Sequence, residues 1–510
     1  MFLDRGEPPV LVIGAGPTGL TAALELSRLG VPVRIVDSAP EPSTTSRALG
    51  IQARTLELLR PRGVADEMLA LGNQVRRTAL HVGGRQLAAV DFTRMPSQFD
   101  FILMLAQSET ERLLTERLGS QGVKVERGLS YTTLVEGPES VEVTLTAPDG
   151  TVETAKASYV IAADGSHSPV RKSLGLPFTG RSLPQSYVLG DLHLDGAIAE
   201  DQLSIFLAAN GFLAVFPMGD GRFRFMATDP DGVTGDTATP TLADVQALYD
   251  RTAGVPARLY DLNWSSRFRI NSRVVNTLRQ GRVFLGGDAA HVHSPAGGQG
   301  MNAGIQDMVN LSWKLAMVLR GQADPALLDT YESDRLPVIR QLVGMTERAT
   351  TVFNSTSPLA HAALTRLAPL ALSRDAVQNR AAPRLGQLTA SYRGRPITKG
   401  GGRIGHLRAG DRVPDAALAD GRLYDAVDTS ALTLLVSGLE PAVARSLTDA
   451  VRPWAEAVVV REVTLPADVV SGPAWLLVRP DGHLAAAGRA GDGARLTSWL
   501  GRWLLTPSRE

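Results

Sequence analysis

Residues 14–19 (GAGPTG) carry three glycines at the spacing of a phosphate-binding turn, between a short apolar run and a helical pattern. Gly14 would allow a tight turn, Gly16 would let a pyrophosphate approach the backbone, and Gly19 would let helix and strand pack closely. The helix N-terminus would offer N–H groups and a positive dipole end to the phosphates. Asp37 ends the next predicted strand, where a carboxylate can accept both hydroxyls of a ribose. The pattern predicts a dinucleotide site but does not separate NAD from FAD.

Two further segments place glycine and aspartate directly after short apolar runs. Residues 162–171 (AADGSHSPVR) follow a predicted strand at 158–162. Residues 286–304 (GGDAAHVHSPAGGQGMNAG) follow a predicted strand at 282–286 and open a predicted helix from about 301 to 319. Three nucleotide-type motifs in this order are far more specific than one, because a plain NAD-dependent dehydrogenase needs only the first.

Together the three motifs resemble those of the class A flavoprotein monooxygenases, the aromatic hydroxylases related to p-hydroxybenzoate, phenol and polyketide hydroxylases. The resemblance covers residues 9–390 and continues more weakly to the C-terminus. It implies FAD as cofactor, NADPH or NADH as reductant and O2 as co-substrate. It also implies that a C4a-hydroperoxyflavin hydroxylates a phenolic or polycyclic polyketide ring. The sequence identifies neither that ring nor the nicotinamide.

The resemblance assigns particular residues to the cofactor. Asp288 would hold the ribityl chain, and Arg47 would lie near the flavin and its diphosphate. Gln107, just before a predicted helix at 108–118, would approach the ribityl and phosphate groups. Backbone N–H groups of residues 298–302 would face the pyrimidine edge of the flavin, at a helix N-terminus that favours negative charge. The predicted cofactor-binding residues are Gly14, Gly16, Pro17, Thr18, Gly19, Asp37, Arg47, Gln107, Asp164, Gly165, Arg171, Gly287, Asp288, Pro295, Gly298, Gly300, Met301 and Asn302.

No pattern of side chains indicates a nucleophile or an acid–base pair, so no catalytic residue is assigned. His291 and His293 form an HxH pair without an acidic or histidine partner at helical spacing, and we expect loop packing rather than a metal site. For Gln306, Asp307 and Asn310 on the following helix, we expect a solvated face or internal caps. Two alternatives stay open: a Baeyer–Villiger or epoxidising reaction on a related polyketide, and a non-catalytic flavin-fold binding protein.

The predicted fold is α/β, with a Rossmann-like FAD-binding domain, an inserted antiparallel sheet and a C-terminal thioredoxin-like domain. Residues 178–275 differ in composition from the segments before them, because apolar and β-branched runs alternate with Gly and Asp turns. This segment would form the substrate-binding sheet. The FAD-binding domain would comprise residues 1–177 and, with a helical region, residues 276–393. Residues 394–510 would form the C-terminal domain. Its resemblance rests on ALTLLVSG and on the RPDGH segment at 479–483.

A substrate pocket should lie between the flavin and the inserted sheet, as the resemblance implies. Side chains alternate between the two faces of a strand, so about half of the aromatic candidates should face away from the pocket. The candidate substrate-binding residues are Phe206, Phe212, Phe216 and Phe225.

The amino-acid composition narrows the classes of protein to which the chain can belong. The 510 residues, 44% hydrophobic and 20% charged, predict two to four globular domains. Lys+Arg and Asp+Glu both number 52, so we expect no nucleic-acid partner. Without cysteine the C-terminal domain cannot perform dithiol chemistry, and we expect it to pack against the core or support a homodimer. With no signal-peptide pattern and no apolar run of about 18 residues, we expect a cytoplasmic protein without a membrane span.

Overall fold

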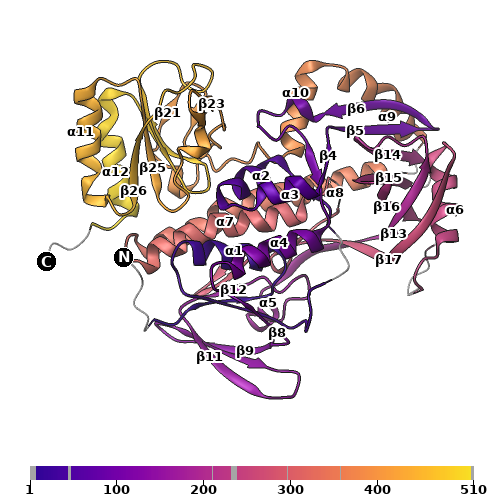
Figure 1. Ribbon diagram of the computed structural model, residues 1–510, viewed down its shortest axis with the longest axis horizontal. Helices are drawn as coiled ribbons and strands as arrows, with labels where there is room; N and C mark the ends of the chain where they lie inside the picture. The colour runs from indigo at the N-terminus through magenta and orange to yellow at the C-terminus, as the bar shows by residue number, and fades with distance from the viewer. Residues whose placement is uncertain are drawn as a thin grey trace.

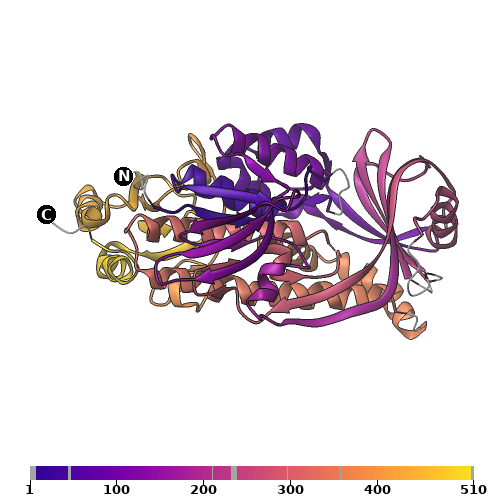
Figure 2. The same cartoon turned by 90° about the horizontal axis from the view of Figure 1, so that it is seen from below.

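The computed structural model describes residues 7–43, 48–208, 211–230, 232, 238–295, 297–355 and 358–506. A central domain, the predicted FAD-binding domain, lies between a large, mostly antiparallel sheet at one end and the C-terminal domain at the other (Figures 1 and 2). The sheet and the C-terminal domain therefore lie at opposite ends of the central domain.

A six-stranded sheet in the order β18-β19-β12-β1-β2-β8 forms the base of the FAD-binding domain. The apolar run VLVI is buried throughout and forms β1, which pairs in parallel with β12 and β2. Because β1, β12 and β19 run parallel, the three motif loops that follow them meet at one edge of the sheet. The strands are β1 (Val10–Ile13), β2 (Val33–Asp37), β8 (Val125–Arg127), β12 (Val160–Ala162), β18 (Arg279–Gln280) and β19 (Val283–Leu285).

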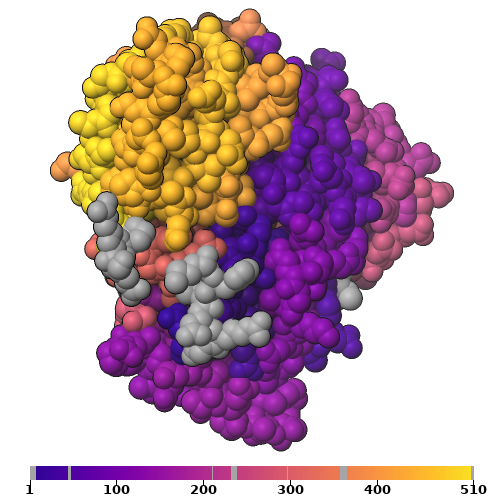
Figure 3. Space-filling view, turned by 60° about the vertical axis from the view of Figure 1, so that its left-hand side comes forward, coloured from indigo at the N-terminus to yellow at the C-terminus, as the bar shows by residue number. Residues whose placement is uncertain are grey.

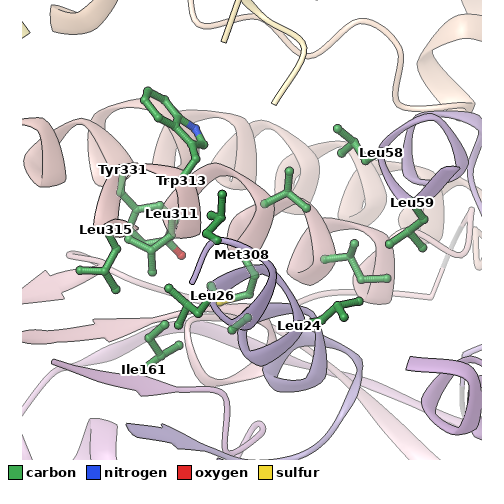
Figure 4. Close-up of a cluster of buried hydrophobic side chains, with 14 of the residues drawn as sticks. Leu24, Leu26, Leu58, Leu59, Ile161, Met308, Leu311, Trp313, Leu315 and Tyr331 are labelled. Atoms are coloured by element: carbon green, nitrogen blue, oxygen red, sulfur yellow. The ribbon is translucent and has the colours of Figure 1, made fainter. Parts of the chain in front are cut away.

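Helix α1 (Pro17–Arg28) packs between α4 (Gln107–Gly119) and α7 (Gly300–Leu319). Leu24 and Leu26 of α1 lie beneath Met308 of α7 in a buried apolar cluster (Figure 4). Burying each such side chain stabilises the fold by about 1.5–3 kcal/mol. Trp313 projects from the opposite side of α7, toward the C-terminal domain (Figure 4). Helix α7 is thus buried on both sides.

No helix among the described residues is long and apolar enough to cross a membrane.

The other elements of the central domain surround this core. Two small antiparallel sheets are β3 (Gly50–Ile51) with β7 (Ile102–Met104) and β4 (Asn73–Val75), and β9 (Ser130–Glu136) with β10 (Val141–Thr146) and β11 (Val152–Ala157). The helices are α2 (Ala53–Leu59), α3 (Ala65–Leu71), α5 (Pro169–Ser173), α8 (Asp329–Phe353), α9 (Pro358–Leu372) and α10 (Asp375–Leu385).

The large sheet has eight strands in the order β20-β17-β13-β16-β15-β14-β5-β6, and its neighbouring strands are antiparallel except for β14 and β5. Its sequence span exceeds the predicted segment 178–275, because β5 pairs in parallel with β14 and β20 joins β17. Helix α6 (Leu242–Ala253) covers one face. The strands are β5 (Arg77–Val82), β6 (Arg85–Asp91), β13 (Phe178–Gly196), β14 (Gln202–Ala208), β15 (Gly211–Gly219), β16 (Arg222–Asp229), β17 (Ala257–Val275) and β20 (His291–Val292).

The C-terminal domain has a βαβ unit followed by a ββα unit, with sheet order β26-β25-β27-β28, the topology of a thioredoxin-like fold. Its buried residues continue the apolar core of the FAD-binding domain, so the two domains pack against each other (Figure 3). The elements are β25 (Leu432–Ser437), α11 (Pro441–Val451), β26 (Val458–Glu462), β27 (Ala474–Val478), β28 (Leu484–Gly488) and α12 (Gly493–Trp503). Two hairpins precede them, β21 (Arg403–Ile404) with β22 (Leu407–Arg408) and β23 (Ala417–Leu418) with β24 (Gly421–Arg422).

Candidate flavin and substrate site

A cavity of about 400 Å³ lies where the three motif loops meet the large sheet. Ten of the predicted cofactor residues line it: Gly16, Pro17, Thr18, Gln107, Gly165, Asp288, Pro295, Gly298, Gly300 and Met301. Apolar side chains of β13, β15, β16 and β17 also line it: Leu189, Phe216, Met226, Phe268 and Ile270. The fold therefore joins the predicted cofactor loops and the sheet in one cavity.

The three glycines of the first motif have different surroundings. A Cβ atom added to Gly14 would lie 2.3 Å from the Ala163 carbonyl oxygen, and one added to Gly19 would lie 1.8 Å from that of Gly14. Both glycines therefore allow β1, α1 and the loop after β12 to pack. Gly16, at the N-cap of α1, has nothing within 4 Å of such a Cβ atom. It leaves open space beside the positive end of the helix, which suits a diphosphate.

Asp37 lies next to this turn, at the end of β2. Its Oδ2 accepts the Ala15 N–H at 2.6 Å, and its Oδ1 accepts the Ala39 N–H at 2.8 Å. The carboxylate is thus held beside the glycine turn. Its predicted contact with the adenosine ribose stays a prediction.

In the second motif, Asp164 has one bonded and one orphaned oxygen. Its Oδ2 accepts the Val170 N–H at 3.1 Å, whereas its buried Oδ1 has no hydrogen-bond partner among the described residues. Burial raises the pKa of Asp164 above its ordinary value, although hydrogen bonds from Ser168 and Val170 oppose this. An orphaned buried oxygen is a site for a donor, and hydroxyl groups of FAD could supply one.

Arg171 does not line the cavity. Its guanidinium donates to the Ala289 carbonyl at 2.8 Å and to the Ser166 carbonyl at 2.9 Å, and it stacks on Phe178 at 3.9 Å. It therefore ties the second motif to the third. These contacts give Arg171 a positioning role, and its predicted contact with the cofactor stays a prediction.

The third motif is anchored by Asp307 of α7, a residue for which the sequence predicts a solvated face or cap. Asp307 is buried, and its Oδ2 accepts the Gly287 N–H at 3.2 Å and His291 Nε2 at 2.8 Å. Arg335 of α8 donates to its Oδ1 at 2.7 Å. Burial alone would raise the pKa of Asp307, but Arg335 and His291 outweigh it and hold the pKa below its ordinary value. The side chain of the neighbouring Asp288 is exposed in the cavity.

Asn302 is also a positioning residue and does not line the cavity. Its amide donates to the carbonyls of Gly50 and Gly298, both at 2.8 Å, and its oxygen accepts the Gln52 N–H at 2.8 Å. These bonds hold the turn that precedes α7. Because α7 begins at Gly300, the positive end of its dipole lies at the cavity, where it can stabilise negative charge.

Two other predicted cofactor residues have different outcomes. Gln107 is the first residue of α4 and lines the cavity. Its Oε1 accepts the Ala48 N–H at 3.3 Å, and its amide donates to Glu111 at 2.8 Å. Arg47 lies outside the described residues.

The four candidate phenylalanines divide between the two faces of the large sheet. Phe216 lines the cavity, and Phe212 lies on the same face, where it packs against Tyr187 and Phe353. Phe206 and Phe225 point to the other face and belong to the core beneath α6. The sheet therefore assigns Phe206 and Phe225 to the core instead of the predicted pocket, because alternation defines two faces without telling which is buried.

A charge pair on the large sheet connects the cavity wall to Ala48, which lies just before β3. Arg224 donates to both Asp191 oxygens, at 2.7 and 2.8 Å, and to the Ala48 carbonyl at 3.1 Å. Trp264 Nε1 also donates to Asp191, at 2.8 Å. Arg224 lines the cavity with its charge already paired, so it fixes the sheet against the FAD-binding domain.

His293 brings an unprotonated nitrogen to the cavity lining. Its Nδ1 donates to the Ser294 carbonyl at 2.8 Å, so Nε2 is left as an acceptor, buried and without a partner among the described residues. Burial lowers the pKa of His293 to about 4. The imidazole is therefore neutral near pH 7. The isolated HxH spacing does not contain this information.

These features define an α/β flavoprotein fold with an added substrate sheet. A family model described as FAD binding domain matches residues 7–346, and one described as aromatic-ring hydroxylase, C-terminal, matches residues 406–507. The chain belongs to the FAD-dependent aromatic-ring hydroxylases.

Three similar proteins show the extent of the match. The chain is 36% identical to a 6-methylpretetramide 4-monooxygenase of Streptomyces rimosus, over 99% of this chain and 95% of that protein. It is 33% identical to a pentachlorophenol 4-monooxygenase of Sphingobium chlorophenolicum, over 90% and 86%. The solved structure of an anhydrotetracycline hydroxylase from Streptomyces rimosus has a TM-score of 0.78 and 31% identity, over 97% and 98%.

Proposed function

We propose that this hydroxylase uses NAD(P)H and O2 to introduce one oxygen atom into a phenolic or polycyclic polyketide ring. One observation carries the proposal: a single cavity has cofactor loops on one part of its lining and an apolar, partly aromatic wall on another. The similarity over nearly the whole chain to proteins named for pretetramide and anhydrotetracycline favours a polyketide of that kind.

The residues present fit FAD. The open space at Gly16 and the N-terminus of α1 would hold the diphosphate, and Asp37 would bind the ribose. Asp288 would bind the ribityl chain, and the turn at 298–301 would face the flavin ring. When bound, FAD supplies the redox chemistry, accepting electrons from NAD(P)H and activating O2.

The protein's own part is to bind, orient and exclude water. Phe216, Phe268 and Met226 offer an apolar wall against which a planar ring can lie. His293 Nε2 can accept a hydrogen bond from a phenolic hydroxyl and so orient the ring. A phenolic ring held in this way favours hydroxylation over a Baeyer–Villiger or epoxidising reaction. Determining the structure of the product distinguishes these reactions.

The test is NADPH and NADH oxidation by the purified, yellow protein in the presence of simple phenols and aromatic polyketides. We expect at least one ring compound to accelerate oxidation and to be recovered with one added oxygen. Oxidation that no compound accelerates, with hydrogen peroxide as the sole oxygen product, would reject the proposal.

Substrate binding should also control the first half-reaction. We propose that reduction by NAD(P)H is slow until a ring compound occupies the cavity, which requires that the compound binds two conformations with different affinity. Anaerobic stopped-flow reduction with and without the best compound tests this. Equal rates would reject it.

We propose the cytoplasm as the place of action, because NADPH and NADH are supplied there. That the protein forms a homodimer stays a prediction, which a light-scattering measurement of its mass tests. A monomeric mass at working concentration would reject it.

A further inference from the structure

One turn of the C-terminal domain is inserted into the FAD-binding domain. Residues 479–483 connect β27 to β28, and the side chains of Arg479 and Asp481 are buried. Arg479 donates to Asp334 of α8 at 2.9 Å. The Asp481 carboxylate accepts from Asn310 of α7 at 3.0 Å, and its carbonyl accepts from Arg54 of α2. The turn therefore contacts three helices of the FAD-binding domain.

These contacts continue to the third motif. The Arg479 guanidinium lies 5.0 Å from the centre of the Tyr392 ring, and the Tyr392 hydroxyl accepts from Arg335 at 3.1 Å. Arg335 follows Asp334 on α8 and donates to Asp307. Asp307 in turn holds the Gly287 N–H and His291, at the two ends of the loop that contains Asp288. A continuous series of buried contacts thus joins the turn to the loop that lines the cofactor cavity.

Burial makes this series sensitive to the loss of one member. The side chains of Arg479, Asp334, Arg335 and Asp307 are at most 1% exposed. Lys314 adds a further buried cation, which donates to Asp334 at 2.9 Å. Removing one partner leaves a buried charge without compensation, and the neighbouring charges must shift to relieve it. A shift of Arg335 would release Asp307 and with it the loop.

We propose that the turn at 479–483 positions the FAD-binding loop: Arg479 holds Asp334 and Tyr392, these fix Arg335 and Asp307, and Asp307 fixes Gly287 and Asp288. The C-terminal domain would then contribute to FAD affinity although none of the described residues that line the cavity belongs to it. The inference rests on the proposed contact of Asp288 with FAD.

The test compares FAD dissociation constants of apoproteins, measured by flavin fluorescence. Arg479→Met should raise the dissociation constant about 2- to 30-fold, the size of effect that remote residues in a coupled network have. Arg422→Met is the control, because Arg422 is also a C-terminal-domain arginine paired with a buried carboxylate, that of Asp415. Its guanidinium donates to the side chain and the carbonyl of Asp415, away from the turn at 479–483. The variant should therefore lower thermal stability and leave the dissociation constant unchanged.

A double-mutant cycle separates this role from general destabilisation. Because Arg479 acts through Asp307, the effect of Arg479→Met should largely disappear in an Asp307→Asn background. Arg479→Lys, which keeps the charge and is expected to fold, should give a smaller rise. An unchanged dissociation constant in Arg479→Met, or the full rise in the Asp307→Asn background, would overturn the inference. Wild-type protein that binds no FAD would instead reject the proposed function.

Discussion

Replacing Gly16 with alanine should separate FAD binding from folding. Gly16 has φ −75° and ψ −179°, a conformation that alanine adopts without strain, and a Cβ atom there meets nothing within 4 Å. Alanine in place of a compatible glycine stabilises by about 0.4–1 kcal/mol, but alanine is a poorer N-cap than glycine by a similar amount. The stability of the apoprotein should therefore change by less than about 1 kcal/mol.

The effect on FAD follows from the same open space. If the diphosphate lies against Gly16, the added methyl group occupies part of its volume. Overpacking of this kind costs about 1–3 kcal/mol. At about 1.4 kcal/mol for each tenfold change, the FAD dissociation constant should rise about 5- to 150-fold.

The assay is fluorescence titration of apoprotein with FAD, together with thermal unfolding without FAD. Gly119→Ala is the control, because a Cβ atom there also meets nothing within 4 Å and the residue lies at the end of α4 away from the cavity lining. Gly16→Ala with an unchanged dissociation constant would refute the placement of the diphosphate. If the Gly16→Ala apoprotein is unfolded, the inference that the folded chain has room for a Cβ atom at this position is refuted.

Three further changes test other parts of the site. Asp288→Ala should yield flavin-poor protein with unchanged far-ultraviolet circular dichroism; stoichiometric FAD after purification would count against the ribityl contact. Phe216→Ala should raise KM for the ring substrate without changing FAD affinity, whereas Phe225→Ala should cost about 3–5 kcal/mol of stability; kinetics and thermal unfolding distinguish the two, and the reverse pattern would contradict the assignment of faces. Because burial lowers the pKa of His293 from 6.5 to about 4, the folded state binds fewer protons than the unfolded chain, and stability should fall as pH drops through this interval. His293→Gln should flatten that part of the plot of unfolding temperature against pH, and an identical plot would exclude His293 as the cause.

The motif loops could be predicted because their signals are local. The run at 10–13, the glycines at 14–19 and Asp37 describe one strand, turn, helix and strand, and the structure has these elements in that order. The predicted helix at 301–319 corresponds to α7, which begins one residue earlier. Each element here is set by residues within a few turns of it.

The sheet faces and the buried charges depend on distant segments. Strand β5 joins the large sheet by pairing with β14, more than a hundred residues later, and no local pattern contains that pairing. The faces of Phe206 and Phe225 depend on where α6 and the cavity lie. The sequence predicts a solvated or capping residue at Asp307, yet α8 and the third motif cover it. Polarity alone does not show that a helix is buried on both sides.

The most direct test of the central claim is the source of the oxygen added to the ring. The enzyme is incubated with NAD(P)H, isotopically heavy dioxygen and the ring compound that most accelerates NAD(P)H oxidation, and the product is examined by mass spectrometry. We expect a hydroxylated ring with one heavy oxygen atom from dioxygen. A product whose new oxygen comes from water would contradict the proposed monooxygenase reaction.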